Sequence, residues 1–239
     1  MQVRFLKKSL FFCFLLSFRA LAQPDYVRTA DSLFAAGVPE EAALLYEQAL
    51  ADGKPATDAM LLKLAYAYEK KGDVPRLLYF LQVYFDRHPD EQVLRRMSDI
   101  ARVNGLTGYE TDDLNYFYFF YKQYGLYLQL LLLGLGLYVF LVLITKMFQK
   151  QPILQRHKWV LLLYLTGLLV FVNLPEGYQS GVTSHDRVLL RNEPSGAAPV
   201  AETIGRGHKV NILGSKDIWL RIFWNNHLYY IRKDNIWVI

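Results

Sequence analysis

The sequence predicts a membrane protein of mixed α and β structure, built from an α-helical repeat domain, a two-helix transmembrane hairpin and a small all-β barrel. Three observations lead to this fold class. A helical pattern repeats near the N-terminus, two long apolar runs lie between residues 125 and 175, and short β-prone runs separated by turn residues follow. Because 53% of the 239 residues are hydrophobic, their distribution along the chain decides the architecture.

Residues 1–22 follow the plan of a secretory signal peptide. Three basic residues precede an apolar run over 9–18, and the small-residue sequence Ala20-Leu21-Ala22 follows it. As a helix, the apolar run would measure about 15 Å, half of a bilayer core. We therefore expect cleavage after Ala22, and an uncleaved anchor is the alternative. Cys13 lies in this segment, so the mature chain would hold no disulfide and no cysteine-ligated metal.

Two segments of about 34 residues near the N-terminus resemble each other. When Gly37 is aligned with Gly72, Ala30 falls on Ala65 and the small and large residues of the two segments come into register. Such offsets form the packing seam of a helix-turn-helix pair, with glycine at the tight turn. Two pairs rarely bury enough surface by themselves, and residues 91–103 carry apolar side chains at helical spacing. We therefore predict a capping helix there.

These offsets resemble the tetratricopeptide repeat, and with its capping helix the domain would cover residues 23–110. The resemblance implies that the first helix of each pair lines a concave surface that binds a partner. The predicted partner-binding residues form a mixed apolar and acidic set: Asp31, Phe34, Leu62, Tyr66 and Glu69. The alternative is that Phe34 and Leu62 only pack against neighbouring helices. The basic and amide residues that clamp a C-terminal carboxylate in some relatives are absent.

Two apolar runs predict the hairpin. Residues 125–145 would measure about 31 Å as a helix, which is long enough to cross the hydrocarbon core. Residues 159–175 form the second predicted span, whose apolar part measures only about 24 Å and must recruit its flanks. A buried helix of a soluble core is the alternative for this run, but no large soluble domain is available to cover it. Gly134 and Gly136 would permit close approach of the two helices.

Charged and aromatic residues orient the hairpin. Residues 111–124 are rich in tyrosine and phenylalanine, which is typical of the headgroup region, with a docking surface for another membrane protein as the alternative. Residues 146–158 carry four basic side chains and no acidic one, which predicts a cytoplasmic loop. Both flanking domains would then lie in the periplasm of a bacterium, anchored in the inner membrane and in contact with its lipid. The signal peptide independently predicts export of the N-terminal domain.

The net charge of +5 does not indicate a nucleic-acid partner. Residues 23–115 carry ten basic against sixteen acidic side chains, and the positive excess lies in residues 1–22 and 116–175. Basic residues in those places set membrane topology rather than bind a polyanion.

Residues 180–239 predict the small β barrel. The expected strands are 187–190, 201–204, 209–213, 218–223, 228–231 and 236–239. Asn225-Asn226 tolerates positive φ and predicts a hairpin turn. An arginine-turn-proline sequence from Arg191 to Pro194, glycines before a strand, and Trp219 at the start of the next resemble a bacterial SH3-type domain. Tyr229-Tyr230-Ile231 departs from the usual glycine-tryptophan-valine. The resemblance implies cell-wall peptides, and so peptidoglycan, as a ligand to consider.

No residue set in the sequence predicts catalysis. The histidines do not lie at metal-ligand spacings, and no phosphate-binding glycine loop, nucleophile elbow or paired-carboxylate pattern occurs. A site shared by His185, His208 and His227 is the alternative. We expect a non-enzymatic protein with no metal and no cofactor.

The full order of segments resembles the BatE-type proteins of bacterial aerotolerance operons. The resemblance covers the whole chain and implies protein partners, namely von Willebrand A-domain membrane proteins and a MoxR-type ATPase. The resulting hypothesis is a scaffold or adaptor in an oxidative-stress complex. The alternative is a cell-wall sensor whose SH3-like module binds peptidoglycan.

Overall fold

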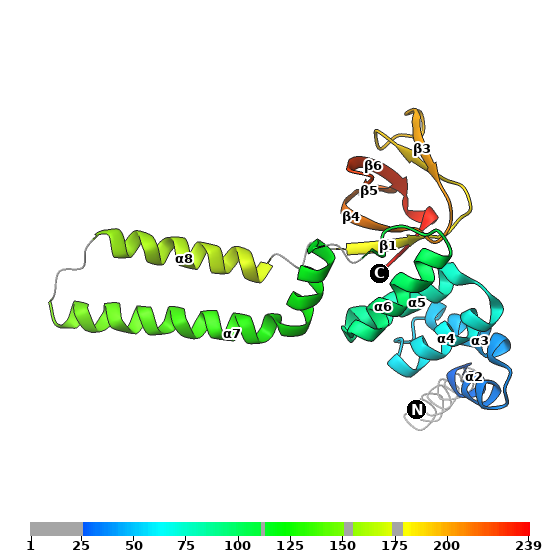
Figure 1. Ribbon diagram of the computed structural model, residues 1–239, viewed down its shortest axis with the longest axis horizontal. Helices are drawn as coiled ribbons and strands as arrows, with labels where there is room; N and C mark the ends of the chain where they lie inside the picture. The colour runs from blue at the N-terminus through cyan, green and yellow to red at the C-terminus, as the bar shows by residue number, and fades with distance from the viewer. Residues whose placement is uncertain (1–25, 111–112, 151–154, 174–178) are drawn as a thin grey trace, which may run out of the picture. The chain divides into compact units, whose positions relative to one another are not determined.

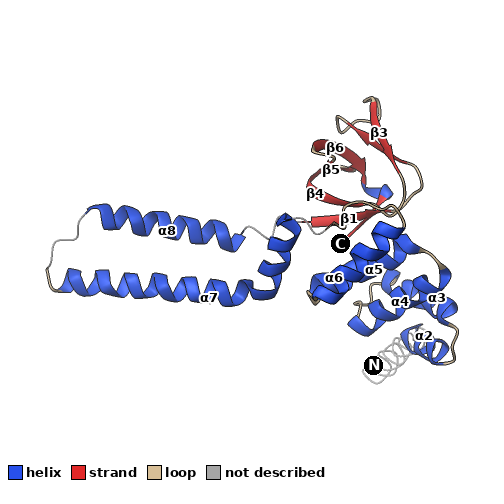
Figure 2. Cartoon of the chain, viewed as in Figure 1, coloured by secondary structure: helices blue, strands red, loops and turns tan. Residues whose placement is uncertain are grey.

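The computed structural model describes residues 26–110, 113–150, 155–173 and 179–239. The chain divides into two compact units, Met1–Lys71 and Gly72–Ile239. The first half is helical and the C-terminal part is a β-sheet, as predicted (Figure 2). The predicted signal peptide, the middle of the predicted basic loop and the end of the second predicted span lie outside the described residues.

Three helices form the described part of the first unit: α2 (Tyr26–Ala35), α3 (Pro39–Ala51) and α4 (Asp58–Lys71) (Figure 1). Ala30 of α2 and Ala42, Tyr46 and Ala49 of α3 are completely buried. Gly37 connects the two helices with a φ of 82°, a conformation that residues with a side chain avoid. The predicted helix-turn-helix pair is therefore confirmed, with the small residues in its seam and the glycine at its turn.

The second unit opens with two helices, α5 (Val74–Arg87) and α6 (Glu91–Val103). An aspartate caps each of them by accepting a hydrogen bond from a backbone N–H, Asp73 for α5 and Asp90 for α6. α6 coincides with the predicted capping helix and buries Met97.

Two long helices follow, α7 (Asp113–Phe148) and α8 (Gln155–Asn173), and they run side by side (Figure 1). Within Phe120–Phe148, an 18-residue stretch of α7 has a mean hydropathy of 2.4, and none of that stretch is buried. By length and composition α7 is therefore able to cross a membrane. Among the described residues it is the one helix that meets both criteria.

Tyr164 of α8 holds α7 and α8 together. Its hydroxyl donates a hydrogen bond to the carbonyl of Leu132. Its ring also packs over Gly136, where an added Cβ would lie 3.0 Å from the ring, whereas Gly134 faces open space. Nearer the start of α7, the Tyr121 hydroxyl donates to a backbone carbonyl of α8 at 3.2 Å. The close approach of α7 and α8 therefore depends on Gly136 and not on Gly134.

The C-terminal module is a seven-stranded antiparallel sheet in the order β3-β2-β6-β5-β4-β1-β7. Its strands are β1 (Gln179–Thr183), β2 (Val188–Arg191), β3 (Val200–Ile204), β4 (Lys209–Lys216), β5 (Trp219–Trp224), β6 (His227–Arg232) and β7 (Ile236–Val238). Asn225 and Asn226 form the β5–β6 turn with φ values of 47° and 63°, which confirms the predicted hairpin. Leu220, Ile222 and Trp224 alternate along β5 and face the core.

Strand β1 has no counterpart among the predicted strands. Its sequence begins with Gln-Ser-Gly, which has little β-propensity, yet the strand pairs with both β4 and β7. Gly181 is required there, since an added Cβ would lie 2.7 Å from the Ile236 side chain. A second difference concerns Ile218, which was expected to begin the strand 218–223. It lies instead in the β4–β5 turn with Asp217, whose φ is 54°, and its side chain is exposed.

Candidate functional site

The predicted partner-binding residues Phe34, Leu62 and Tyr66 line one open hollow of about 720 Å³ on the first unit. The rings of Phe34 and Tyr66 meet edge to face, with their centroids 5.6 Å apart. Leu62 and Tyr66 are 43% and 45% exposed, so neither side chain is buried against neighbouring helices. Exposed aromatic and leucine side chains in a concave surface are typical anchors for a protein partner.

Asp31, which was also predicted to bind the partner, connects three helices. Its carboxylate accepts hydrogen bonds from Lys63 Nζ at 2.6 Å and from the Tyr46 hydroxyl, so it joins α2, α3 and α4. The hydrogen bond from Lys63, followed by that from Tyr46, holds the pKa of Asp31 below its ordinary value. The same bond to Asp31 raises the pKa of Lys63, and burial raises that of Tyr46. Asp31 therefore links the three helices and is not among the residues that line the hollow.

Glu69, the fifth predicted residue, is exposed on α4 and does not line the hollow. Two lysines that were not predicted do line it. Lys63 Nζ lies 5.5 Å from the Phe34 ring centroid, and Lys70 Nζ lies 5.5 Å from that of Tyr66. The hollow is thus lined by aromatic and apolar side chains together with two lysines and one carboxylate, Glu40. The helical spacing of Lys63, Tyr66 and Lys70 on α4 could have indicated this.

A second candidate site is a joint inside the second unit, where the helices before α7 contact the β module after α8. The Arg206 guanidinium donates to the Asp73 carboxylate at 3.1 Å. Lys209 Nζ donates to the Gln82 side chain at 3.0 Å. Because these partners are more than 120 residues apart in the chain, no local pattern in the sequence could predict them.

The segment that follows α6 completes this joint. The backbone N–H of Lys209 donates to the Thr107 carbonyl at 3.0 Å, and the Thr107 N–H donates to His208 Nδ1 at 3.2 Å. Gly108 lies so close that an added Cβ would sit 2.0 Å from the Lys209 carbonyl oxygen. Tyr109 is 5% exposed and donates its hydroxyl to the Gly207 carbonyl at 3.1 Å, and burial raises its pKa.

Trp237 of β7 forms the aromatic part of the joint. Its ring centroid lies 5.6 Å from that of Tyr79 on α5, and the guanidinium carbons of Arg206 and Arg76 lie 5.3 Å and 5.9 Å from it. A tryptophan in contact with two guanidinium groups and a second ring combines burial with cation–π attraction. The joint therefore consists of polar, charged and aromatic contacts at several points.

The histidines do not form a shared site in the described part of the chain. His208 belongs to the joint, where burial lowers its pKa, and His185 contacts Ser184 at 2.8 Å. No group of three His, Cys, Asp or Glu side chains there could hold a metal ion. The chemistry available at the hollow and at the joint is recognition, through aromatic faces, cations and hydrogen bonds.

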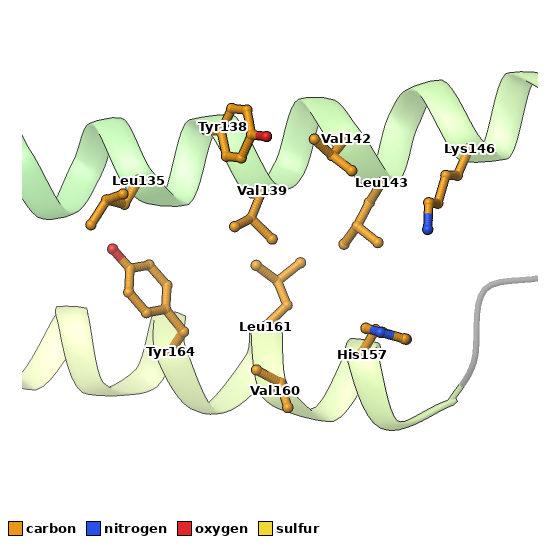
Figure 3. A pocket seen from close by; sticks show the side chains of 10 residues that line it. All are labelled: Leu135, Tyr138, Val139, Val142, Leu143, Lys146, His157, Val160, Leu161 and Tyr164. Atoms are coloured by element: carbon orange, nitrogen blue, oxygen red, sulfur yellow. The ribbon is translucent and has the colours of Figure 1, made fainter.

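A further hollow of about 460 Å³ lies between α7 and α8. Figure 3 shows Val139 and Leu161 facing each other across it, with Lys146 and His157 toward one end. Its walls are mainly leucine, valine and tyrosine, which suits an apolar environment.

No protein-family model and no curated protein sequence matches this chain.

Proposed function

We propose that this chain is a non-enzymatic scaffold or adaptor, anchored in a membrane by two spans, with its helical repeat and β module exposed on the same side. The partner would bind the hollow formed by Phe34, Leu62, Tyr66, Lys63 and Lys70. By its resemblance to BatE-type proteins, the proposed setting is an aerotolerance complex in a bacterial inner membrane. The proposed partners are von Willebrand A-domain membrane proteins.

The observation that carries this proposal is the joint itself. Asp73, Gln82 and Thr107 precede α7, whereas Arg206 and Lys209 follow α8, and direct hydrogen bonds connect the two groups. If α7 crosses a membrane, the chain has to cross back before these contacts can form. α8 lies between α7 and the β module, and its 19 residues would measure about 28 Å, close to a hydrocarbon core.

Charge supports one orientation of such a hairpin. Lys146 lies in the last turn of α7, Arg156 and Lys158 lie in the first turn of α8, and the connecting residues contain no acid. The positive-inside rule favours a cytoplasmic position for this turn. The repeat and the β module would then both be periplasmic, which agrees with the predicted signal peptide.

Impermeant-maleimide labelling of single-cysteine variants tests the topology. On a Cys13→Ser background, we expect Glu91→Cys and Asp186→Cys, both at exposed positions, to be labelled in cells whose outer membrane has been made permeable. Gln151→Cys should be labelled only after the inner membrane is opened. Labelling of Gln151→Cys from outside would overturn the two-span topology.

Co-purification tests the binding surface. We expect Phe34→Ala with Tyr66→Ala to reduce recovery of an A-domain partner about tenfold or more, because truncation of aromatic anchors typically costs at least 1 to 2 kcal/mol. Leu44→Ala is the matched control, since Leu44 is 60% exposed and does not line the hollow. Equal recovery from both variants would contradict the assignment of the hollow. Retention of the full chain on purified sacculi would instead favour the cell-wall alternative.

A further inference from the structure

We propose that the β module binds a carboxylate-bearing ligand with an apolar body, either a small organic acid or the carboxyl end of a peptide. The site is a hollow of about 460 Å³ lined by three arginines, Arg187, Arg191 and Arg232. It lies within the β module and shares no residue with the partner-binding hollow. The inference therefore goes beyond the scaffold function and does not depend on it.

The two-residue period of β2 brings two of these arginines together. Val188 and Leu190 are completely buried in the module's core. Leu189 and Arg191 consequently lie on the opposite face of β2, and together with Arg187, which precedes the strand, they line the hollow. Arg232, at the end of the neighbouring strand β6, supplies the third guanidinium group.

The charges around the hollow are not balanced. Asp234 is the one carboxylate in the lining, and it accepts a hydrogen bond from Arg232 Nη2 at 2.8 Å. Arg191 donates to the Ala198 carbonyl, which positions its side chain but leaves its charge unpaired. Arg187 makes no hydrogen bond or ion pair with any residue that the structure describes. Guanidinium groups gathered around a concave surface create a positive potential that attracts an anion.

The shape and the remaining lining select the kind of anion. A guanidinium group binds a carboxylate through two parallel hydrogen bonds, and Arg187 has its donors available for this. Leu189, Ile218 and Trp219 form an apolar wall beside the arginines. A ligand with a carboxylate and a hydrocarbon body would contact both the arginines and the apolar wall, whereas inorganic phosphate would contact only the arginines.

Calorimetric titration of the full chain in detergent tests the site with N-acetyl-leucine, its uncharged amide and the peptide acetyl-Ala-Ala-Leu. We expect saturable binding of the acid with a Kd of about 1 mM or tighter, and binding of the amide at least about tenfold weaker. Tighter binding of the peptide than of N-acetyl-leucine would identify a peptide end as the source of the carboxylate. Equal binding would identify a small acid.

Arg187→Gln is expected to raise the Kd for the acid about tenfold or more. Arg187 is exposed and lies outside the core, so the variant should keep the thermal stability of the parent. Arg221→Gln is the matched control, because it removes an exposed arginine of β5 that does not line the hollow. The proposal is overturned if acid and amide bind equally, if neither binds, if phosphate binds as tightly as the acid, or if both variants lose the same affinity.

Discussion

The guanidinium of Arg206 donates a hydrogen bond to the carboxylate of Asp73 at 3.1 Å, although the two residues are 133 positions apart. Asp73 also caps α5, so one carboxylate both begins a helix and holds the β module. Between these residues in the chain lie α7 and α8. The contact therefore joins the segment that precedes α7 to the segment that follows α8.

The Arg206–Asp73 pair should contribute measurably to the joint. We expect a coupling energy of about 0.5 to 1 kcal/mol between Arg206→Gln and Asp73→Asn in a double-mutant cycle, because both side chains are largely but not fully buried. Asparagine keeps the cap of α5, so the cycle isolates the charge. Hydrogen exchange at the Lys209 amide, which donates to Thr107, measures the opening free energy. Additive effects would show that the pair contributes nothing.

Gly108→Ala should loosen the same joint. The added Cβ would lie 2.0 Å from the Lys209 carbonyl oxygen, and the φ of 90° is also unfavourable for alanine. We expect a loss of more than about 2 kcal/mol, seen as a lower thermal midpoint of the β module. Gly105→Ala is the control, because its φ of 64° is also positive but its Cβ would meet no atom within 4 Å. Equal effects of the two variants would contradict a tight contact.

Acid should weaken the joint through His208. Burial lowers the pKa of this histidine below its ordinary value of 6.5, despite the opposing influence of Glu110 and Glu202. The folded state therefore disfavours the proton, and stability falls as the pH drops below about 6.5, where the unfolded histidine becomes charged. Protonation would also turn Nδ1 from an acceptor of the Thr107 N–H into a donor.

We expect faster hydrogen exchange of residues 107–109 at pH 5.5 than at pH 7.5, after correction for the intrinsic exchange rate. The pH dependence should diminish in His208→Gln. An unchanged dependence in that variant would exclude His208 as its source.

Asp31 should make the first unit sensitive to stronger acid. Its pKa lies below the ordinary value of 3.8, chiefly because it accepts a hydrogen bond from Lys63. The stabilisation is present above about pH 3.8 and is lost as the pH falls through the lower folded-state pKa. Below pH 4, the Asp31→Asn variant should therefore lose less helicity than the parent protein as the pH falls. Circular dichroism measures this loss. A parallel loss in both proteins would contradict this link between the helices.

A larger side chain at Gly136 should separate α7 from α8. An added Cβ there would already lie 3.0 Å from the Tyr164 ring, so Gly136→Val has no room without movement of a helix. We expect less disulfide formation between Val139→Cys and Leu161→Cys, which face each other in Figure 3. Gly134→Val is the control because Gly134 faces open space. Equal cross-linking in the two backgrounds would show that Tyr164 does not pack on Gly136.

Several features could be predicted from the sequence because they depend on neighbouring residues. The apolar period of 91–103 predicted α6 at its observed bounds, and Asn225-Asn226 predicted the β5–β6 turn. Strand β1 was missed for the opposite reason. Its glycine, serine and threonine become a strand only because β4 and β7 satisfy its backbone on both sides.

The sequence by itself determined the helical pair, the apolar run of α7 and the character of the C-terminal module, since periodicity and turn chemistry act over a few residues. Only the tertiary structure decided which charged side chains line each hollow. Asp31 is neutralised by Lys63 from another helix, and Arg232 joins Arg187 and Arg191 from a different strand. The joint between Asp73 and Arg206 was decided in the same way. Such contacts depend on how distant segments pack, and local patterns in the chain carry no record of that packing.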